Sequence, residues 1–227
     1  RKESSAASDV YKRQAQSFLR RWRASGTPRV LSIAGSDPSG GAGIQADLKS
    51  IAANGGYGMA ALTALTAQNT VGVRAVHVPP AEFLREQLDA ISDDIVIDAV
   101  KIGMLANADV IRAVSDWLDA MQPPIVVLDP VMVATSGDRL LDREAEVALR
   151  GLLERAHVVT PNLAELAALA DHPIDGWDDA LAAAAALSDR VGAAVLVKGG
   201  HLDGDDVPDA VIDAADGVSR GLSLIHI

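Results

Sequence analysis

The sequence predicts a single α/β domain built on a mainly parallel sheet with helices on both faces. Two patterns in its 227 residues predict this class. Short, uniformly apolar runs, typical of buried parallel strands, alternate with stretches whose apolar positions recur at helical spacing. Glycine and polar residues gather directly after nearly every apolar run, and in such sheets ligands bind at the carboxyl ends of the strands. No linker rich in Gly, Pro or Ser divides the chain, and we therefore expect one domain.

The first elements illustrate both patterns. Val30–Ala34 is an apolar run that ends at Gly35, which predicts a strand. Ile44, Leu48 and Ile51 then recur at helical spacing, and the Asn-Gly-Gly sequence at 54–56 ends the predicted helix. The same reasoning predicts, in chain order, strand 59–65, an extended piece 73–78, helix 80–91, strand 98–102, helix 110–118, strand 125–128, helix 145–153, strand 157–160, helices 163–169 and 180–187, and strand 194–198.

The two ends of the sequence differ from this middle part. Residues 1–14 show neither helical nor strand periodicity, and residues 222–227 form an apolar run with no turn or cap before it. Both resemble translated sequencing adapters, with native tails as the alternative. We therefore predict tails at 1–25 and 218–227, a domain at 26–217, and further native sequence missing after that domain.

The composition excludes several classes of function. The chain carries 20 basic and 31 acidic residues, a net charge of −11, so no nucleic-acid partner is expected. It has no cysteine, which excludes a disulfide framework, a thiolate metal site and a cysteine nucleophile. The apolar runs are shorter than the roughly 18 residues that cross a bilayer, so no membrane partner is expected. We predict an acidic, soluble, cytoplasmic globular protein.

Candidate functional residues lie at the predicted strand ends. Asp129 follows a strand and precedes proline, either as a ligand-binding carboxylate or as a loop aspartate that caps local amides. Asn162 and Glu165 have the spacing of an N-cap and N3 pair, which predicts a capping box and is compatible with a second role. The two carboxylates could share one Mg²⁺ and its waters. Lys198, directly before two glycines, could neutralise phosphate charge or be a solvated strand-end lysine.

The glycine-rich segment that follows the first strand allows a weaker interpretation. Gly41, Gly43 and Ala46 match the dinucleotide fingerprint, in which glycines let a pyrophosphate approach a helix N-terminus. That fingerprint also requires an acidic residue about twenty positions later, and residues 60–66 contain none. The glycine pattern alone therefore does not establish nucleotide binding.

Six segments in order resemble the hydroxymethylpyrimidine and phosphomethylpyrimidine kinases of thiamine biosynthesis, within the ribokinase-like superfamily. The resemblance runs from about Val30 to about Asp213. It implies a three-layer αβα, ribokinase-like fold with a mainly parallel central sheet. The segments are AGSDPSGGAGIQADLK at 34–49, TALTAQNT at 63–70, KIGML at 101–105, LDPVMVATSGD at 128–138, TPNLAEL at 160–166 and VKGGH at 197–201.

The resemblance also implies an activity and the roles of individual residues. Such a kinase transfers the γ-phosphoryl group of ATP to 4-amino-5-hydroxymethyl-2-methylpyrimidine and then to its monophosphate, with Mg²⁺, as a homodimer. Gln68 has a physical rationale, because its amide can donate to a ring nitrogen and accept from an amine. The implied pyrimidine pocket consists of Gly35, Asp47, Gln68, Met104 and Val131. The implied phosphate side consists of Asp129 and Glu165 at the metal, and of Asn162 and Lys198 at the nucleotide, with Lys198 supporting catalysis.

One departure from the family pattern limits these expectations. The family's phosphate-binding loop, a Gly-Thr-Gly-Cys segment that also carries the presumed base, has no counterpart after Lys198. We therefore predict a chain that lacks the last elements of the fold and half of the ATP site and is inactive as it stands. We also expect the strand at 194–198 to be an unprotected edge, with Val195 and Val197 partly exposed. A pyridoxal-type kinase and a non-catalytic pyrimidine-binding protein are the alternatives.

Overall fold

The computed structural model describes residues 26–132, 141, 143–200, 206–213 and 218–225. Its main feature is an eight-stranded sheet with the order β10-β9-β8-β7-β6-β5-β1-β2. The neighbours from β8 to β2 are parallel, and β9 and β10 are antiparallel, which confirms a mainly parallel sheet. The strands are β1 (Arg29–Ala34), β2 (Tyr57–Leu62), β5 (Ala99–Ile102), β6 (Val126–Leu128), β7 (Val158–Val159), β8 (Ala194–Lys198), β9 (Asp206–Asp213) and β10 (Val218–Ile225).

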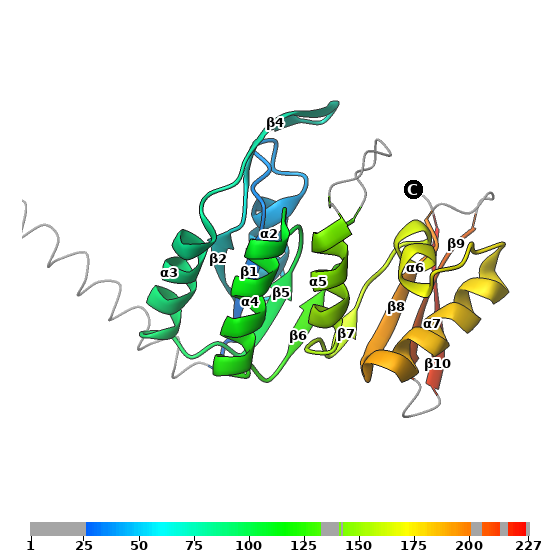
Figure 1. The fold of residues 1–227 in the computed structure, drawn as a ribbon. Helices are drawn as coiled ribbons and strands as arrows, with labels where there is room; N and C mark the ends of the chain where they lie inside the picture. The colour runs from blue at the N-terminus through cyan, green and yellow to red at the C-terminus, as the bar shows by residue number, and fades with distance from the viewer. Residues whose placement is uncertain (1–25, 133–140, 142, 201–205, 214–217, 226–227) are drawn as a thin grey trace, which may run out of the picture.

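Helices lie on both faces of this sheet, so the described part of the chain has three layers. The chain steps one way across the sheet from β1 to β2 and the other way from β2 through β5 to β8. Because crossovers between parallel strands are right-handed, α2 must lie on the face opposite to the later helices, as Figure 1 shows. The helices are α2 (Gly43–Ala53), α3 (Ala81–Ser92), α4 (Ala108–Met121), α5 (Arg143–Leu153), α6 (Leu163–Ala170) and α7 (Trp177–Val191).

The core lies between the sheet and the layer formed by α3 to α7. Burial alternates along β5, where Val100 and Ile102 are buried and Ala99 and Lys101 are only half-buried. Strands β6 to β8 alternate in the same way. On the opposite face α2 has no fully buried residue. The α2 side of the sheet therefore leaves room for polar side chains next to β1 and β5.

The expectation that β8 is an exposed edge is wrong. Val195 and Val197 are both 0% exposed. Their burial follows because β9 pairs with β8 in antiparallel register and α7 packs against both strands. Beyond β9, residues 218–225 of the predicted tail form β10. The predicted tail at 1–25 and residues 226–227 lie outside the described residues, as do 133–138 of the LDPVMVATSGD segment and His201.

A separate two-stranded sheet, β3 (Leu65–Asn69) and β4 (Gly72–His77), projects beyond the carboxyl edge of the main sheet (Figure 1). The sequence predicts a strand that continues to residue 65, whereas β2 ends at Leu62. The buried Thr63 explains the break. Its amide donates to Ala34 O (3.1 Å) and its hydroxyl donates to Met104 O (2.6 Å), so the chain is anchored at the sheet edge before β3 begins.

None of the helices in the described ranges combines the length and the hydropathy that crossing a bilayer requires.

Candidate active site

The loop after β1 is organised around Asp37, a buried residue to which the sequence assigned no role. Its Oδ1 accepts from the amide (2.8 Å) and the hydroxyl (2.7 Å) of Ser39, and its Oδ2 accepts from the amides of Gly41 (3.0 Å) and Ala42 (2.8 Å). The Ser39 hydroxyl, with these amides, holds the pKa of the Asp37 carboxyl below its ordinary value, although burial opposes the shift. The loop is therefore fixed by one ionised carboxylate. A local signal exists in the sequence, because aspartate commonly accepts from amides two or more residues later.

This loop folds back over the end of β1. The Ile44 amide donates to Gly35 O (3.0 Å), and the Asp37 amide donates to the Gln45 side chain (2.8 Å). Gly43 has a φ of +54°, and a Cβ there would lie 2.3 Å from Gly35 O. Only glycine allows this close approach of the two backbone segments. The glycines thus shape a tight turn beside the sheet.

Three of the predicted pocket residues lie around the carboxyl ends of β1 and β5. Gly35 and Met104 are in direct contact, since a Cβ on Gly35 would lie 2.6 Å from Met104 Cε. Asp47, on α2, accepts at Oδ2 from Ser32 Oγ (2.6 Å) on β1 and from Lys101 Nζ (2.9 Å) on β5. Neither Ser32 nor Lys101 was predicted as a site residue. Their partner is distant in sequence, so no local pattern indicates the contact.

Gln68, the fourth predicted pocket residue, reaches the same region through the hairpin. It lies on β3, and its Oε1 lies 3.2 Å from Thr66 Oγ1. The Thr66 hydroxyl also lies 2.7 Å from Ser36 O and donates to one of these two acceptors, and its amide donates to Ser36 Oγ (3.3 Å). Thr66 is therefore tied to the loop that begins after Gly35, and Gln68 lies beside this contact. Val131 is half-buried just after β6, and within the described part of the chain its amide donates to Asp129 O (2.8 Å) rather than to any of the other four residues.

A charged cluster lies at the ends of β6, β7 and β8. Asp129 follows β6, and its Oδ1 accepts from Lys198 Nζ (2.8 Å) on β8 and from Thr160 Oγ1 (3.2 Å) after β7. The Asp129 side chain is 26% exposed and the Lys198 side chain 38% exposed. Lys198 is thus an ion-paired lysine rather than an isolated solvated one. Both charges remain accessible to a ligand.

Asn162 and Glu165 complete this cluster and form the predicted capping box of α6. The Asn162 amide donates to Glu165 Oε2 (2.9 Å), and the Glu165 amide donates to Asn162 Oδ1 (2.9 Å). Glu165 is 3% exposed, and this burial raises the pKa of its carboxyl, with a further increase from the charge of Asp129. The amides of Asn162 and Met132 and the charge of Lys198 act in the opposite direction. Glu165 therefore has a structural role, which leaves room for a second one.

The donor set of this cluster suits a hard cation. Within the described residues, no group of three or more His, Cys, Asp or Glu side chains is arranged to hold a metal ion on its own. Asp129, directly after β6, and Glu165, in the first turn of α6, provide carboxylate oxygens. Mg²⁺ commonly binds one or two carboxylates and completes its coordination with water and substrate phosphates. The residues present therefore fit Mg²⁺ held together with a nucleotide.

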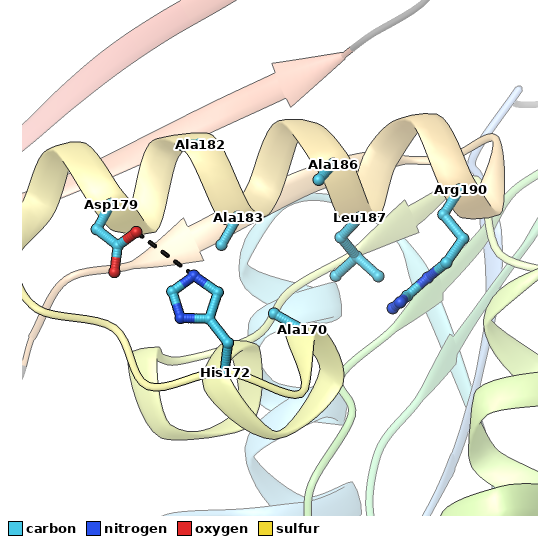
Figure 2. Close-up of a pocket in the computed structure, with 8 residues that line it drawn as sticks. All are labelled: Ala170, His172, Asp179, Ala182, Ala183, Ala186, Leu187 and Arg190. Atoms are coloured by element: carbon cyan, nitrogen blue, oxygen red, sulfur yellow. Dashed lines mark ion pairs between the residues drawn. The ribbon is translucent and has the colours of Figure 1, made fainter.

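A pocket of about 240 Å³ lies elsewhere, between α6 and α7 (Figure 2). Alanine and leucine side chains form most of its lining, with His172 and Asp179 at one end and Arg190 at the other. His172 Nε2 lies 3.5 Å from Asp179 Oδ1. None of the predicted site residues lines it, and it belongs to the helical layer rather than to the carboxyl edge of the sheet. We therefore place the candidate active site at that edge.

Comparison with known proteins identifies relatives of this chain. The phosphomethylpyrimidine kinase family matches residues 37–220 of this chain. The thiamine biosynthesis multifunctional protein ThiED of Corynebacterium glutamicum is 56% identical over 186 residues, which are 82% of this chain and 24% of that protein. The hydroxymethylpyrimidine/phosphomethylpyrimidine kinase of Rhizobium meliloti is 51% identical over 189 residues, 82% of this chain and 71% of that kinase. The chain thus spans about a quarter of the multifunctional relative.

Solved structures give the same result and confirm the ribokinase-like architecture. Phosphomethylpyrimidine kinase from Clostridium difficile has a TM-score of 0.79 at 40% identity, covering 86% of this chain and 84% of that one. The ADP complex of Bacillus subtilis pyridoxal kinase has a TM-score of 0.78 at 35% identity, covering 89% and 76%. Since the family match spans most of the sequence and includes every predicted site residue except Gly35, this chain belongs to the phosphomethylpyrimidine kinase family.

Proposed function

We propose that this chain is part of an ATP-dependent kinase that phosphorylates 4-amino-5-hydroxymethyl-2-methylpyrimidine and then its monophosphate. The observation that carries the proposal is the arrangement of two clusters along one edge of the sheet. Gly35, Asp47 and Met104 gather at β1 and β5, and the Asp129–Lys198 pair lies next to them at β6 and β8. A ring bound at the first cluster would present its hydroxymethyl arm toward the second.

The pyrimidine pocket would be formed by Gly35, Asp47, Gln68, Met104 and Val131. With no side chain at Gly35, the Met104 thioether packs directly on the backbone there and offers an apolar surface to a flat ring. The Asp47 carboxylate would accept from the ring's amino group. The Gln68 amide would donate to a ring nitrogen, because an amide can donate and accept at one site.

The phosphate side would be formed by Asp129, Asn162, Glu165 and Lys198. The hydroxymethyl oxygen forms a bond to the γ-phosphorus of ATP, the bond from that phosphorus to the β-phosphate oxygen breaks, ADP leaves and the hydroxyl proton is released. Such transfer depends mainly on positioning and charge neutralisation, and Lys198 would supply positive charge to the phosphates while Asn162 orients them. Mg²⁺, held by oxygens of Asp129 and Glu165, would neutralise further phosphate charge when bound.

A pyridoxal-type kinase is the second candidate, because four structures of the pyridoxal kinase from Staphylococcus aureus match the fold with TM-scores of 0.76 to 0.79 at 34% identity. Identity to the pyrimidine kinases is higher, from 40% to 51%. A pyridine with a hydroxymethyl arm would occupy the same space. The ring substituents that meet Asp47 and Gln68 distinguish the two substrates.

The deciding experiment compares binding and phosphorylation of the two substrates. Calorimetry with the 227-residue chain should show tighter binding of the pyrimidine than of pyridoxal. Phosphorylation is followed by mass spectrometry with ATP in a chain extended by the family's Gly-Thr-Gly-Cys segment. Binding and phosphorylation of pyridoxal alone would overturn the choice of substrate, and pyrimidine binding without phosphorylation by the extended chain would favour a non-catalytic binding protein.

The same proposal includes a cytoplasmic homodimer. The support is the family membership. Analytical ultracentrifugation tests the assembly, and sedimentation as a monomer at micromolar concentration would remove the dimer from the proposal.

A further inference from the structure

We propose that Lys101, together with Ser32, is a positioning residue that holds the Asp47 carboxylate ready for substrate. The inference rests on the proposed function, because that proposal is what places Asp47 in the pyrimidine pocket. It extends the site by two residues, one on β1 and one on β5.

The sheet register places Ser32 and Lys101 side by side. They are direct partners in the parallel pairing of β1 with β5, so their side chains leave the sheet on the same face. Both donate to Asp47 on α2, which shows that this is the face that α2 covers. A lysine in a short apolar strand thus has its ammonium group directed at one carboxylate. The contact joins three elements, β1, β5 and α2.

The two donors use only one oxygen of Asp47. Ser32 Oγ and Lys101 Nζ lie 2.6 Å and 2.9 Å from Oδ2. Ser32 is 0% exposed, and the side chains of Asp47 and Lys101 are 17% and 30% exposed. Within the described ranges, no protein group donates to Oδ1. Oδ2 is therefore held by donors on the sheet, while Oδ1 keeps its full capacity to accept a hydrogen bond from a ligand.

This arrangement has two consequences for binding. A carboxylate that accepts from two donors through one oxygen cannot rotate freely, so less conformational freedom is lost when a substrate binds. The lysine charge also balances the carboxylate charge, and the pair suits an uncharged ring with an amino donor better than a ring bearing an anionic oxygen. Lys101 would thereby contribute to the preference for the aminopyrimidine without touching it.

A purely structural role for the pair must be distinguished from this one. The ion pair also ties α2, which buries no residue fully, to the sheet. If that were its whole function, loss of Lys101 would lower the melting temperature and leave the affinity of the folded protein unchanged. If Lys101 acts through Asp47, pyrimidine affinity falls, and the fall disappears once Asp47 has lost its charge.

The test is a double-mutant cycle in the 227-residue chain, with pyrimidine binding measured by calorimetry and unfolding measured by circular dichroism. Lys101→Met should weaken binding about tenfold, as expected for loss of a charge-assisted hydrogen bond that orients the acceptor. In an Asp47→Asn background the same change should alter the Kd less than about twofold, because coupled residues are non-additive. Arg85→Met is the control, since it removes an exposed ion pair on α3 and should leave the Kd unchanged.

Milder variants keep the proposal testable if Lys101→Met does not fold. Lys101→Arg retains a donor and should bind the pyrimidine more tightly than Lys101→Met or Lys101→Gln, and Ser32→Ala should weaken binding about twofold to threefold. Wild-type affinity in Lys101→Gln, or a full effect of Lys101→Met in the Asp47→Asn background, would overturn the positioning role while leaving the proposed function in place. A wild-type chain that binds no pyrimidine would overturn both.

Discussion

Replacing Glu165 by glutamine should separate the structural role of this residue from its proposed catalytic role. The carboxylate accepts from the amides of Asn162 and Met132 and lies 3% exposed beside the charges of Asp129 and Lys198. Glutamine is almost the same size and also functions at N3 of a capping box. Glu165→Gln should therefore preserve the start of α6. Any large effect on phosphoryl transfer would then come from the lost negative charge.

The expected stabilities follow from the contacts. Glu165→Ala removes the capping partner and leaves two buried amides without an acceptor, and we expect a loss of about 3 kcal/mol in the free energy of unfolding. Glu165→Gln keeps an acceptor for one amide and removes a charge from a buried position, so its stability should lie within about 1 kcal/mol of wild type. The difference in the free energy of unfolding between the two variants measures how much the capping contact stabilises the protein.

The pH dependence gives a second check on the same residue. Because burial raises the folded-state pKa of Glu165 above its ordinary value of 4.5, the protonated form favours folding. This stabilisation is complete below pH 4.5 and is lost as the pH rises through the folded-state pKa. Glu165→Gln does not titrate and lacks this loss. The stability of the variant relative to wild type should therefore increase between acidic and neutral pH.

The assay combines urea unfolding at several pH values with steady-state kinetics in a chain extended by the family's Gly-Thr-Gly-Cys segment. We expect kcat to fall on the order of 10²-fold in Glu165→Gln, as when one preorganised charge interaction with the transition state is removed. The Kd for the pyrimidine should change less than about twofold. Unchanged kcat would show that Glu165 serves only as a cap, and a Glu165→Gln variant as unstable as Glu165→Ala would refute the capping argument.

Three further predictions concern the first loop and the chain as a whole. Asp37→Asn should destabilise the protein at neutral pH. Because the folded-state pKa of Asp37 is lowered, the ionised carboxylate stabilises the fold fully above pH 3.8, its ordinary pKa, and this stabilisation is lost as the pH falls through the folded-state pKa. Urea unfolding at several pH values should show this loss at acidic pH in wild type and not in the variant. Gly35→Ala should weaken pyrimidine binding in calorimetry, because the new methyl group would lie 2.6 Å from Met104 Cε and displace that side chain. The double variant with Met104→Ala should recover part of the affinity. The 227-residue chain, which has no Gly-Thr-Gly-Cys segment after Lys198, should bind the pyrimidine but transfer phosphate far more slowly than an extended chain in a coupled ADP-release assay, and equal rates would contradict this.

The parts of the fold that are specified by residues close together in the sequence could be predicted. The parallel strands are short apolar runs, and the helices repeat their apolar positions, so both appeared near their observed positions. The capping box of Asn162 and Glu165 was likewise predictable, because its two residues are three positions apart. These features depend on neighbours along the chain.

The features that sequence reasoning missed depend on residues far apart in the chain. Strand β9 contains Pro208 and several aspartates, so its pattern is weak, and pairing with β8 is what makes it a strand. Asp47 and Lys101 are separated by 54 positions, and only the sheet register brings Lys101 beside Ser32. The site residues were predicted chiefly through family resemblance, and that route named the residues that we propose to face the ligand rather than those that support them.

The Asp129–Lys198 pair has a consequence that follows from the spacing of the strands. Asp129 follows β6 and Lys198 ends β8, so β7 lies between them, and with neighbouring strands roughly 4.8 Å apart the two backbones are roughly 10 Å apart. The long lysine side chain nevertheless reaches within 2.8 Å of the carboxylate, and Thr160, directly after β7, donates to the same oxygen. The residue that follows the middle strand is therefore expected to need a short side chain. A bulky residue at position 160 would obstruct the lysine's path and separate the two charges without altering either of them.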